Sequence, residues 1–430
     1  MKISLSSEIS SVLQVAHKEE MLDRDDSLAI FIDVAIINDR FKRLKDSFPD
    51  GTLHAIPIKT NPLSYILKHT VAAGMGLEAA SFGEVHLATN AGVDSKKLVF
   101  DSPAKTASEI STLRKVCPGA RLNANSLEEL ERYCSNDSGF RLGLRINPQV
   151  DSQTVASMNL GAKYSKFGVP LIFQAEIIAA CCKWKDIDCL HLHIGSQVPS
   201  TEPMIQAIKK VIALAEMINA KARCRKIRYL NIGGGFPVNY DSTDPYRLEE
   251  FAVELEDQCS QLFSGEFGLI TEYGRYVYAN SAWVASKVEY VKSLRDCQTV
   301  ITHAGADMFI RECYNPEDWY HEIQILNENL EIKNAPNTTT SIAGPLCFGG
   351  DYVARNRDLP QATTGDTVVI RDIGANTFAL WSRHCSRPFP KVFAYNSLIP
   401  DWDLRIVKNR ESYRDIILSL IHISEPTRPY

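Results

Sequence analysis

Side chains suited to chemistry lie at the ends of several apolar runs. Lys59 closes LHAIPIK, and a lysine at the end of a partly buried strand can become a neutral nucleophile. Glu272 and Arg275 lie together in LITEYGR. The arginine could bind a phosphate or a carboxylate, whereas the glutamate would bind a cationic group. The glycine triplet 233–235 follows RYLNI and could offer backbone N–H groups to an anion.

A cofactor could connect these residues. A lysine reacts with an aldehyde, a glycine loop and an arginine bind a phosphate, and a carboxylate pairs with a protonated heterocyclic nitrogen. Pyridoxal 5'-phosphate carries all three groups. We therefore predict that Lys59, the loop 233–235, Glu272 and Arg275 bind this cofactor.

The segment HLHIGSQ adds His193 and Ser196 to the candidate site. Its two histidines, His191 and His193, would lie on the same face of a strand, as they would in a metal site. No carboxylate or cysteine at ligand spacing completes such a site, so we expect no metal. We interpret His193 as a flat imidazole against the face of the cofactor ring.

Eight short apolar runs must position these residues, and stretches long enough for helices separate most of them. This alternation predicts a (β/α)₈ TIM barrel, in which active-site residues gather at the C-terminal ends of the strands. The runs end at Lys59, Ser81, Ser102, Asn125, Asn147, Ser196, Gly235 and Arg275.

Composition and charge narrow the class of protein. The chain has 430 residues, 45% of them hydrophobic and 23% charged, as in ordinary globular proteins. A net charge of −5 and a pI near 6.1 argue against nucleic acid or an anionic membrane as a partner. No run has transmembrane length and no secretory signal is evident. The 11 cysteines contain no CxxC pair, so we expect free thiols in the reducing cytoplasm.

The length fits a barrel of roughly 250 residues and a second domain. We expect an N-terminal helical arm over 1–26 and the cofactor-binding barrel over 27–280, with SLAIFIDVAII as a first strand. A mainly β domain is expected over 281–417, where β-rich runs are split by turn residues. The segment 418–430 looks like a non-native tail, so we expect it to form no part of either domain.

Ordered motifs run through most of the chain. They are IKTNP, EAASFGE, NANSLEEL, LRINP, SKFG, HIGSQ, GGGFP and TEYGR, followed by IRECY, GPLCFGGDYVARNRDLP and GANTFALWSRHCSRP. On these motifs residues 53–415 resemble the fold-type III pyridoxal-phosphate decarboxylases, which include diaminopimelate, ornithine and arginine decarboxylases. The barrel is similar to that of alanine racemase. The GPxCxxGD block and the SRP segment are most similar to the diaminopimelate decarboxylases.

The resemblance implies an amino-acid decarboxylase and a role for each matching residue. Lys59 would bind the cofactor covalently, and His193 would stack on its ring. Cys347, from the partner subunit of a head-to-tail homodimer, would return a proton to the α-carbon. The cofactor-binding residues would be Lys59, His193, Ser196, Gly233, Gly234, Gly235, Glu272, Gly274, Arg275 and Asn376. The substrate-binding residues would be Arg275, Arg311, Tyr314 and Phe348.

Several positions depart from this family's pattern. This chain has EYGR where the family usually has EPGR. It has Asn376 where the family has a tyrosine that contacts the phosphate and the substrate. Phe348 replaces a glutamate that binds the distal amino group in diaminopimelate enzymes. A phenylalanine cannot pair with an ammonium, and an unpaired ammonium costs on the order of 1–3 kcal/mol. The sequence therefore favours decarboxylation of a substrate other than meso-diaminopimelate.

Two other functions stay open at this point. A racemase of the same fold would need a second base opposite Lys59, usually a tyrosine, and Cys347 suits that role poorly. A catalytically silent homologue would bind the cofactor or a regulatory partner without turnover. The loss of the tyrosine at Asn376 favours this second alternative, whereas the retained Lys59, His193 and Glu272 speak against it.

Overall fold

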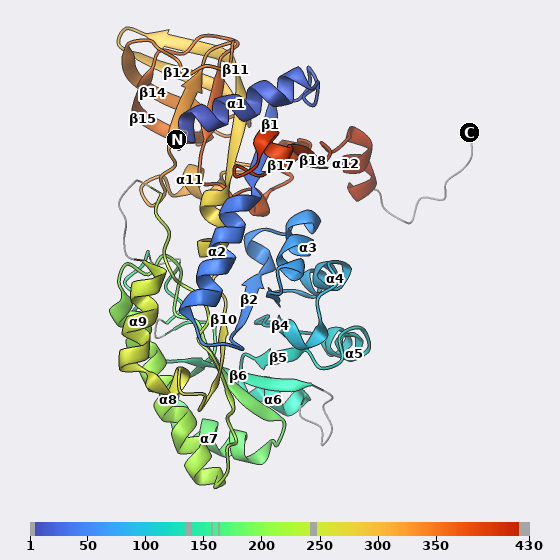
Figure 1. Cartoon of the computed structure of the whole chain (residues 1–430), viewed down its shortest axis with the longest axis vertical. Helices are drawn as coiled ribbons and strands as arrows, with labels where there is room; N and C mark the ends of the chain where they lie inside the picture. Colours follow the sequence, from blue (N-terminus) through green and yellow to red (C-terminus); the bar gives the residue numbers. More distant parts are fainter. Residues whose placement is uncertain (1–4, 134–139, 156–157, 162–163, 241–246, 421–430) are drawn as a thin grey trace, which may run out of the picture. The chain divides into compact units, whose positions relative to one another are not determined.

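The computed structural model describes residues 5–133, 140–155, 158–161, 164–240 and 247–420 (Figure 1). The chain forms two compact units. The barrel unit comprises Ile37–Ala279, and the sheet unit joins Met1–Ile36 to Asn280–Tyr430. No helix in the described part of the chain combines the length and the apolar character that crossing a membrane requires.

The barrel unit is a closed ring of eight parallel strands. Each strand pairs with its neighbours, and the ring closes where β10 pairs with β2 and β5 with β6. These strands coincide with the eight predicted runs, so the predicted TIM barrel is confirmed. They are β2 (Leu53–Pro57), β3 (Gly76–Ala79), β4 (Leu98–Phe100), β5 (Arg121–Ala124), β6 (Arg141–Asn147), β8 (Ile187–Leu192), β9 (Tyr229–Asn231) and β10 (Gly268–Thr271). The two-residue β7 (Val169–Pro170) pairs with the end of β6.

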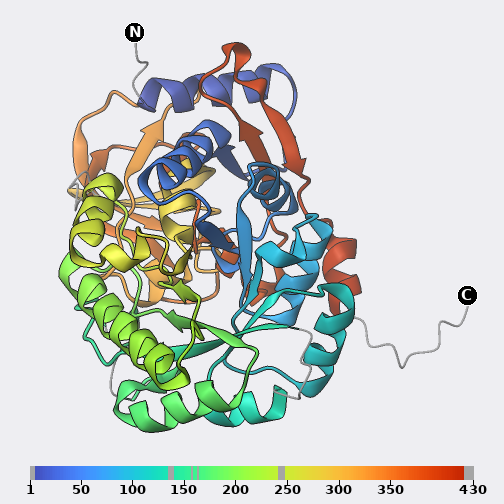
Figure 2. The same cartoon turned by 60° about the horizontal axis from the view of Figure 1, so that its bottom comes forward.

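Helices follow most of these strands and lie around the outside of the ring (Figures 1 and 2). Local signals start some of them: a capping box of Thr106 and Glu109 satisfies the first backbone N–H groups of α5. The helices around the ring are α2 (Val34–Ser47), α3 (Ser64–Ala72), α4 (Phe82–Asn90), α5 (Ala107–Val116), α6 (Leu127–Tyr133), α7 (Gln174–Lys183), α8 (Thr201–Ala222), α9 (Leu248–Gln258) and the short α10 (Gly274–Tyr278).

The sheet unit is built on a mixed sheet with the order β15-β14-β12-β11-β1-β17-β18, and β16 joins β13 to β11. The expected mainly β character of this part is confirmed. Its strands are β1 (Leu28–Asp33), β11 (Ala282–Leu294), β12 (Cys297–Thr302), β13 (Ile323–Leu326), β14 (Asn337–Ala343), β15 (Tyr352–Pro360), β16 (Thr367–Ile370), β17 (Lys391–Tyr395) and β18 (Arg405–Lys408).

The predicted place of the first strand was wrong. We expected residues 27–37 to open the barrel, but β1 pairs antiparallel with β11 and parallel with β17. All six β1 residues are buried, as suits a strand between two neighbours. A continuous apolar run shows that a strand is buried, but it does not show in which sheet the strand lies. The barrel unit begins only at Ile37, within α2.

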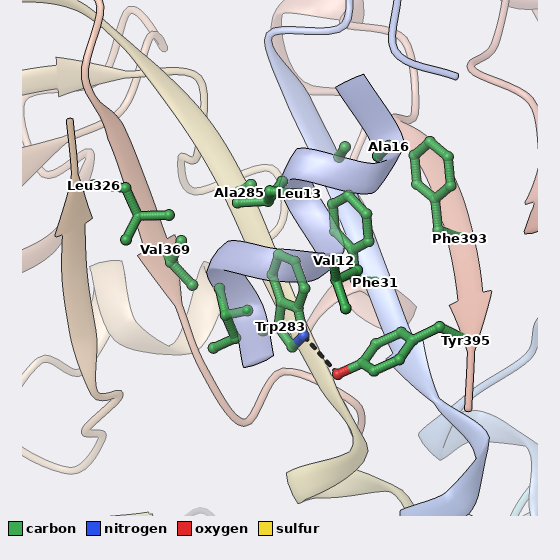
Figure 3. Packing of buried hydrophobic residues seen from close by; sticks show 12 residues of the cluster. Val12, Leu13, Ala16, Phe31, Trp283, Ala285, Leu326, Val369, Phe393 and Tyr395 are labelled. Carbon is green, nitrogen blue, oxygen red and sulfur yellow. Dashed lines mark hydrogen bonds between the residues drawn. The ribbon is translucent and has the colours of Figure 1, made fainter. Parts of the chain in front are cut away.

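The expected N-terminal arm is part of the core of the sheet unit. Residues 5–18 form α1 (Leu5–Lys18), and its buried face includes Val12 and Leu13. This face packs on a cluster in which Phe31 stacks between Trp283 at 4.2 Å and Phe393 at 4.7 Å (Figure 3). At the other end, α12 (Tyr413–Leu420) extends into the segment expected to be a non-native tail. Residues 421–430 of that segment lie outside the described residues.

Candidate active site

Lys59 lies directly after β2, in a short 3₁₀ helix formed by Ile58–Thr60. Its ammonium group donates to the carboxylate of Glu78, which β3 holds in the interior. Desolvation alone would lower the pKa of Lys59, but attraction by Glu78 and Glu272 holds it above its usual value. Burial raises the pKa of Glu78 to about 8, although Lys59 contacts it. Lys59 is thus a protonated amine that must lose a proton before it can act as a nucleophile.

His193 follows β8 and packs against the glycine triplet. The backbone N–H of Gly234 donates to His193 Nδ1 at 2.8 Å, and burial lowers the pKa of His193 to about 3. The imidazole is therefore neutral and carries its proton on Nε2. A Cβ atom on Gly234 would lie 2.5 Å from the carbonyl oxygen of Glu272. Only glycine allows the loop to approach both residues this closely.

Arg275 and Ser196 meet after β10 and β8. The Arg275 Nε donates to Ser196 Oγ at 3.0 Å, and an Arg275 NH group donates to the Tyr240 hydroxyl at 2.8 Å. The neighbouring Gly274 lies against Thr60, where a Cβ would be 2.7 Å from the threonine side chain. Gly235 has a φ of +109°, a left-handed conformation that favours glycine. Four of the predicted phosphate-binding residues thus lie just beyond the ends of β8, β9 and β10, with Gly274 and Arg275 at the start of α10.

Glu272 belongs to a buried network that joins several strands. Asn231 Nδ2 donates to Glu272 Oε1 at 2.7 Å, and His191 Nε2 lies 3.6 Å from Glu272 Oε2. On the other side of His191, its Nδ1 is 3.5 Å from Asp101, which accepts from Arg145 at 2.9 Å. Burial would raise the pKa of Glu272, but attraction by His191 and Lys59 holds it well below its usual range.

Most of this network could not be predicted from the sequence. The sequence shows no carboxylate at ligand spacing from the HxH pair, yet Asp101 and Glu272 both lie against His191. These residues come from β8 and from the ends of β4 and β10, so ligand spacing along the chain could not reveal them. The usable signal was an acidic residue at the end of an apolar run, as in KLVFDS for Asp101 and GLEAA for Glu78.

Other residues at the predicted strand ends support the local backbone. Ser81 caps α4 by accepting from the backbone N–H of Glu84 at 3.2 Å. Asn125 donates to the carbonyl oxygen of Lys166 at 2.9 Å, and Asn147 accepts from the backbone of Gln149. A polar residue at the end of a barrel strand is therefore insufficient evidence for a catalytic role.

The predicted substrate residues of the sheet unit form a second cluster, centred on α11 (Ile310–Tyr314). The Tyr314 and Phe348 rings stack at 4.9 Å with an interplanar angle of 17°. The Arg311 guanidinium lies 4.9 Å from the centre of the Trp319 ring. Cys347, next to Phe348, is exposed. The cluster therefore combines a thiol, an aromatic pair and a cation.

A buried aspartate missed by the sequence analysis shapes the loop that carries Cys347. Asp351 accepts from the backbone N–H groups of Ala306 and Leu346, both at 2.6 Å. A Cβ on Gly344 would lie 2.4 Å from the Asp351 carboxylate.

Asn376, the last of the predicted cofactor-binding residues, has a φ of +55°. This is a left-handed conformation that asparagine adopts more readily than most residues.

Comparison with known proteins identifies the family of these two units. Residues 34–279 match the model of the pyridoxal-binding domain of pyridoxal-dependent decarboxylases, and residues 275–374 match the model of their C-terminal sheet domain. The chain belongs to the pyridoxal-dependent decarboxylases. The resemblance predicted from the motifs is therefore confirmed, and with it the cofactor, pyridoxal phosphate.

Curated and solved relatives agree with this membership. The chain is 28% identical over 391 residues to the diaminopimelate decarboxylase of Aquifex aeolicus, covering 89% of this chain and 88% of that one. The diaminopimelate decarboxylase of Helicobacter pylori is 27% identical over 405 residues, covering 93% and 96%. The H. pylori structure with L-lysine has a TM-score of 0.83 at 26% identity and covers 94% of this chain and 99% of that one. A Vibrio vulnificus lysine/ornithine decarboxylase shares the fold, with a TM-score of 0.77 at 21% identity over 92% of this chain and 98% of that one.

Proposed function

We propose that this pyridoxal-dependent decarboxylase removes the α-carboxylate of an amino acid whose distal end is not an ammonium. The observation that carries the proposal is the set of groups at the C-terminal ends of the barrel strands. A lysine, a neutral imidazole, a carboxylate of lowered pKa and an arginine–serine pair meet there. These groups fit the aldehyde, ring face, protonated ring nitrogen and phosphate of pyridoxal phosphate.

Each residue has a proposed task at the cofactor. Lys59 binds it covalently, His193 lies against its ring, and Glu272 accepts from its protonated nitrogen. The phosphate-binding residues are Ser196, the glycines Gly233, Gly234, Gly235 and Gly274, and Arg275, with Asn376 of the sheet unit as a further contact. The Arg275–Ser196 contact supports this assignment, because donors already gathered in one place lose little entropy on binding an anion.

When bound, pyridoxal phosphate supplies the electron sink that makes loss of the carboxylate possible. The residues of this chain supply the rest. Glu272 stays ionised and therefore holds a proton on the ring nitrogen. His193 is neutral and adds no charge beside the ring. Cys347 Sγ gives a proton to the α-carbon after carbon dioxide leaves, and a thiol suits this task because it can act as a general acid.

The proposed substrate choice rests on Phe348. Its ring stacks on Tyr314, so the position that carries a glutamate in diaminopimelate enzymes is part of an apolar surface here. An ammonium at this surface would lose its ionic partner, whereas an apolar, neutral or carboxylated distal end would not. Arg311 can pair with a distal carboxylate. The curated relatives named above are diaminopimelate decarboxylases, so a change of substrate within the family is the finer part of the proposal.

We also propose a homodimer that shares its active sites and acts in the cytoplasm. The dimer is supported by the division of the chemistry between two units, with Lys59 in one and Cys347 in the other. The cytoplasmic location is supported by the cysteines in the described part of the chain, because all of them are free thiols, as is usual in a reducing compartment.

Carbon dioxide release from the purified protein tests the proposed function. The assay uses a panel of α-amino acids with ammonium, neutral, apolar and carboxylate distal ends, and we expect release with at least one of the last three. Exchange of the α-proton without release of carbon dioxide would indicate a racemase. Cofactor binding without either reaction would indicate the silent homologue.

The proposed attachment point of the cofactor has its own test. The purified protein should be yellow, and borohydride reduction followed by peptide mapping should find the cofactor on Lys59. The Lys59→Ala variant should lose the visible absorption band. A label on another lysine, or an unchanged band in the variant, would contradict the assignment.

A further inference from the structure

His191, on β8, lies between two carboxylates that come from different strands. Its Nδ1 is 3.5 Å from Asp101 Oδ2, and its Nε2 is 3.6 Å from Glu272 Oε2. The His191 side chain is fully buried, and the two carboxylates are at most 6% exposed. Neither ring nitrogen has a hydrogen-bond partner at normal distance within the described part of the chain. The carboxylates are thus the groups that its protons face.

The number of protons on His191 follows from this geometry. A neutral imidazole has one N–H group and one acceptor nitrogen, so one of its nitrogens would point a lone pair at a carboxylate. The imidazolium form directs an N–H group at each carboxylate. His193, two residues along, provides the contrast, because its Nδ1 accepts from a backbone N–H and so must be unprotonated. The two histidines of HLH therefore suit opposite protonation states.

The neighbouring charges also favour the doubly protonated form of His191. Arg145 contacts Asp101 at 2.9 Å, and Lys59 pairs with Glu78. The nearby Lys105 has its own partner, Glu129, at 2.6 Å. The fourth carboxylate is Glu272, and the side chain that donates a hydrogen bond to it is the uncharged amide of Asn231. Lys59 also attracts Glu272, so a cationic His191 adds to the positive charge that offsets the burial of Glu272, whereas a neutral His191 leaves this mainly to Lys59.

A metal ion bound between Asp101, His191 and Glu272 is the alternative to a second proton on His191. The ligand atoms of Asp101, His191 and Glu272 lie within 4.8 Å of one another. The Asp101 oxygen that faces His191 is, however, the one that accepts from Arg145. A metal bound there would share this oxygen with a guanidinium group, so the charges favour a proton over a metal.

We propose that His191 is a positioning residue that stays doubly protonated between Asp101 and Glu272 and thereby keeps Glu272 ionised toward the ring nitrogen of the cofactor. The inference rests on the proposed role of Glu272 in cofactor binding. It assigns His191 no contact with substrate or cofactor. Its effect passes through the carboxylate, whose ionisation decides whether the ring nitrogen keeps its proton.

The dissociation constant of pyridoxal phosphate, measured from pH 6 to pH 8, tests the effect on Glu272. In His191→Gln, Lys59 remains near Glu272 but the charge of His191 is lost, so burial is offset less and Glu272 gains a proton more readily as the pH falls. We expect the dissociation constant to rise at least about tenfold over wild type, and the ratio to be larger at pH 6 than at pH 8. An unchanged constant across this range would overturn the proposal.

His54→Gln is the matched control. His54 is also buried in the barrel, on β2, but its Nδ1 contacts the Thr271 hydroxyl at 2.8 Å and burial lowers its pKa to about 4. It is thus a neutral histidine, and its replacement should leave the dissociation constant within about twofold of wild type at every pH. An equal loss of affinity in both variants would mean that any buried histidine is needed for the fold, and the proposal would fail.

The protonation state itself is measured on cofactor-free wild-type protein with ¹⁵N-labelled histidine, so no variant has to fold for that reading. The His191 signals, assigned by their absence in His191→Gln, should show two protonated ring nitrogens, and the His193 signals only one. A single protonated nitrogen on His191, or a stoichiometric metal in the purified protein, would refute the inference. Failure of wild type to bind the cofactor would instead refute the proposed function.

Discussion

Two carboxylates of the barrel unit, Glu78 and Glu272, are both buried but differ in charge behaviour. Burial raises the pKa of Glu78 to about 8, whereas His191 and Lys59 hold that of Glu272 well below its usual range. A carboxylate like Glu78 can take up a proton near neutral pH, and it contacts the amine that must release one. Glu272 keeps its negative charge. Both carboxylates are buried, so the difference between their pKa values comes from the neighbouring charges.

Substrate choice should change with a single residue, Phe348. In Phe348→Glu, a carboxylate replaces part of the apolar surface beside Tyr314, and we expect the preference for a distal ammonium to increase roughly tenfold, which equals about 1.4 kcal/mol. The measurement is the ratio of kcat/KM for substrates with a distal ammonium and with a distal carboxylate. Phe348→Leu, the control, keeps the surface apolar and should leave this ratio near its wild-type value. Efficient turnover of diaminopimelate by wild type would show that Phe348 does not select the substrate.

At the scale of elements, periodicity predicted the existence of strands better than their partners. The eight barrel strands were found because each is a short apolar run that ends in a polar residue or, for β9, in the glycine triplet 233–235. β1 has the same character, but its partners β11 and β17 lie far along the chain. The burial of α1 was missed as well, because its apolar face has meaning only once the aromatic cluster around Phe31 exists. Local sequence does not contain either of these long-range pairings.

The packing of α1 predicts a large loss of stability on truncation of its buried face. Leu13 is 2% exposed and lies in the same cluster as Phe31 and Trp283. Leu13→Ala should lower the free energy of unfolding by about 2–5 kcal/mol, since it leaves a cavity in a packed core. The exposed neighbour Gln14 provides the control, and Gln14→Ala should change stability by no more than about 0.5 kcal/mol. Urea unfolding followed by tryptophan fluorescence measures both, and equal values would show that α1 is not part of the core.

The segment between α11 and β13 should make the stability of the sheet unit depend on pH. His321 Nε2 lies 2.9 Å from Glu312, and its Nδ1 contacts the Arg371 carbonyl oxygen at 2.7 Å. Burial would lower the pKa of His321, but the bond to Glu312 and its charge raise it above 6.5. A group with a raised pKa in the folded state stabilises fully below its unfolded pKa, and this contribution is lost as the pH rises through the folded value.

Comparison of His321→Gln with wild type measures this contribution. The variant should lose most stability in urea unfolding at pH 6, and the difference should shrink progressively above neutral pH. The exposed His384 provides the control, since His384→Gln should cause no loss that depends on pH in this way. A difference that grows with rising pH would mean that His321 is buried as the neutral imidazole.

At the scale of the whole molecule, the motifs located single residues but not the contacts among them. Lys59, His193 and Glu272 could be identified in the sequence because each lies in a recognisable segment. The network of Asp101, His191 and Glu272 could not, because it exists only after the closure of the barrel brings the ends of β4, β8 and β10 together. The residues proposed to carry the chemistry also belong to different units, since Cys347 lies in the sheet unit and Lys59 in the barrel unit.

This division leads to a prediction about the assembly. If each active site combines Lys59 of one subunit with Cys347 of the other, Lys59→Ala and Cys347→Ala should each be inactive alone. A mixed dimer holds one site with both residues intact, so mixing the variants should restore up to about a quarter of the wild-type activity after random exchange of subunits. Native mass spectrometry of differently tagged subunits establishes the exchange, and mixing two Lys59→Ala preparations is the control. Proven exchange without recovery of carbon dioxide release would place both residues in the site of a single subunit, because only then does every dimer of the mixture lack an intact site.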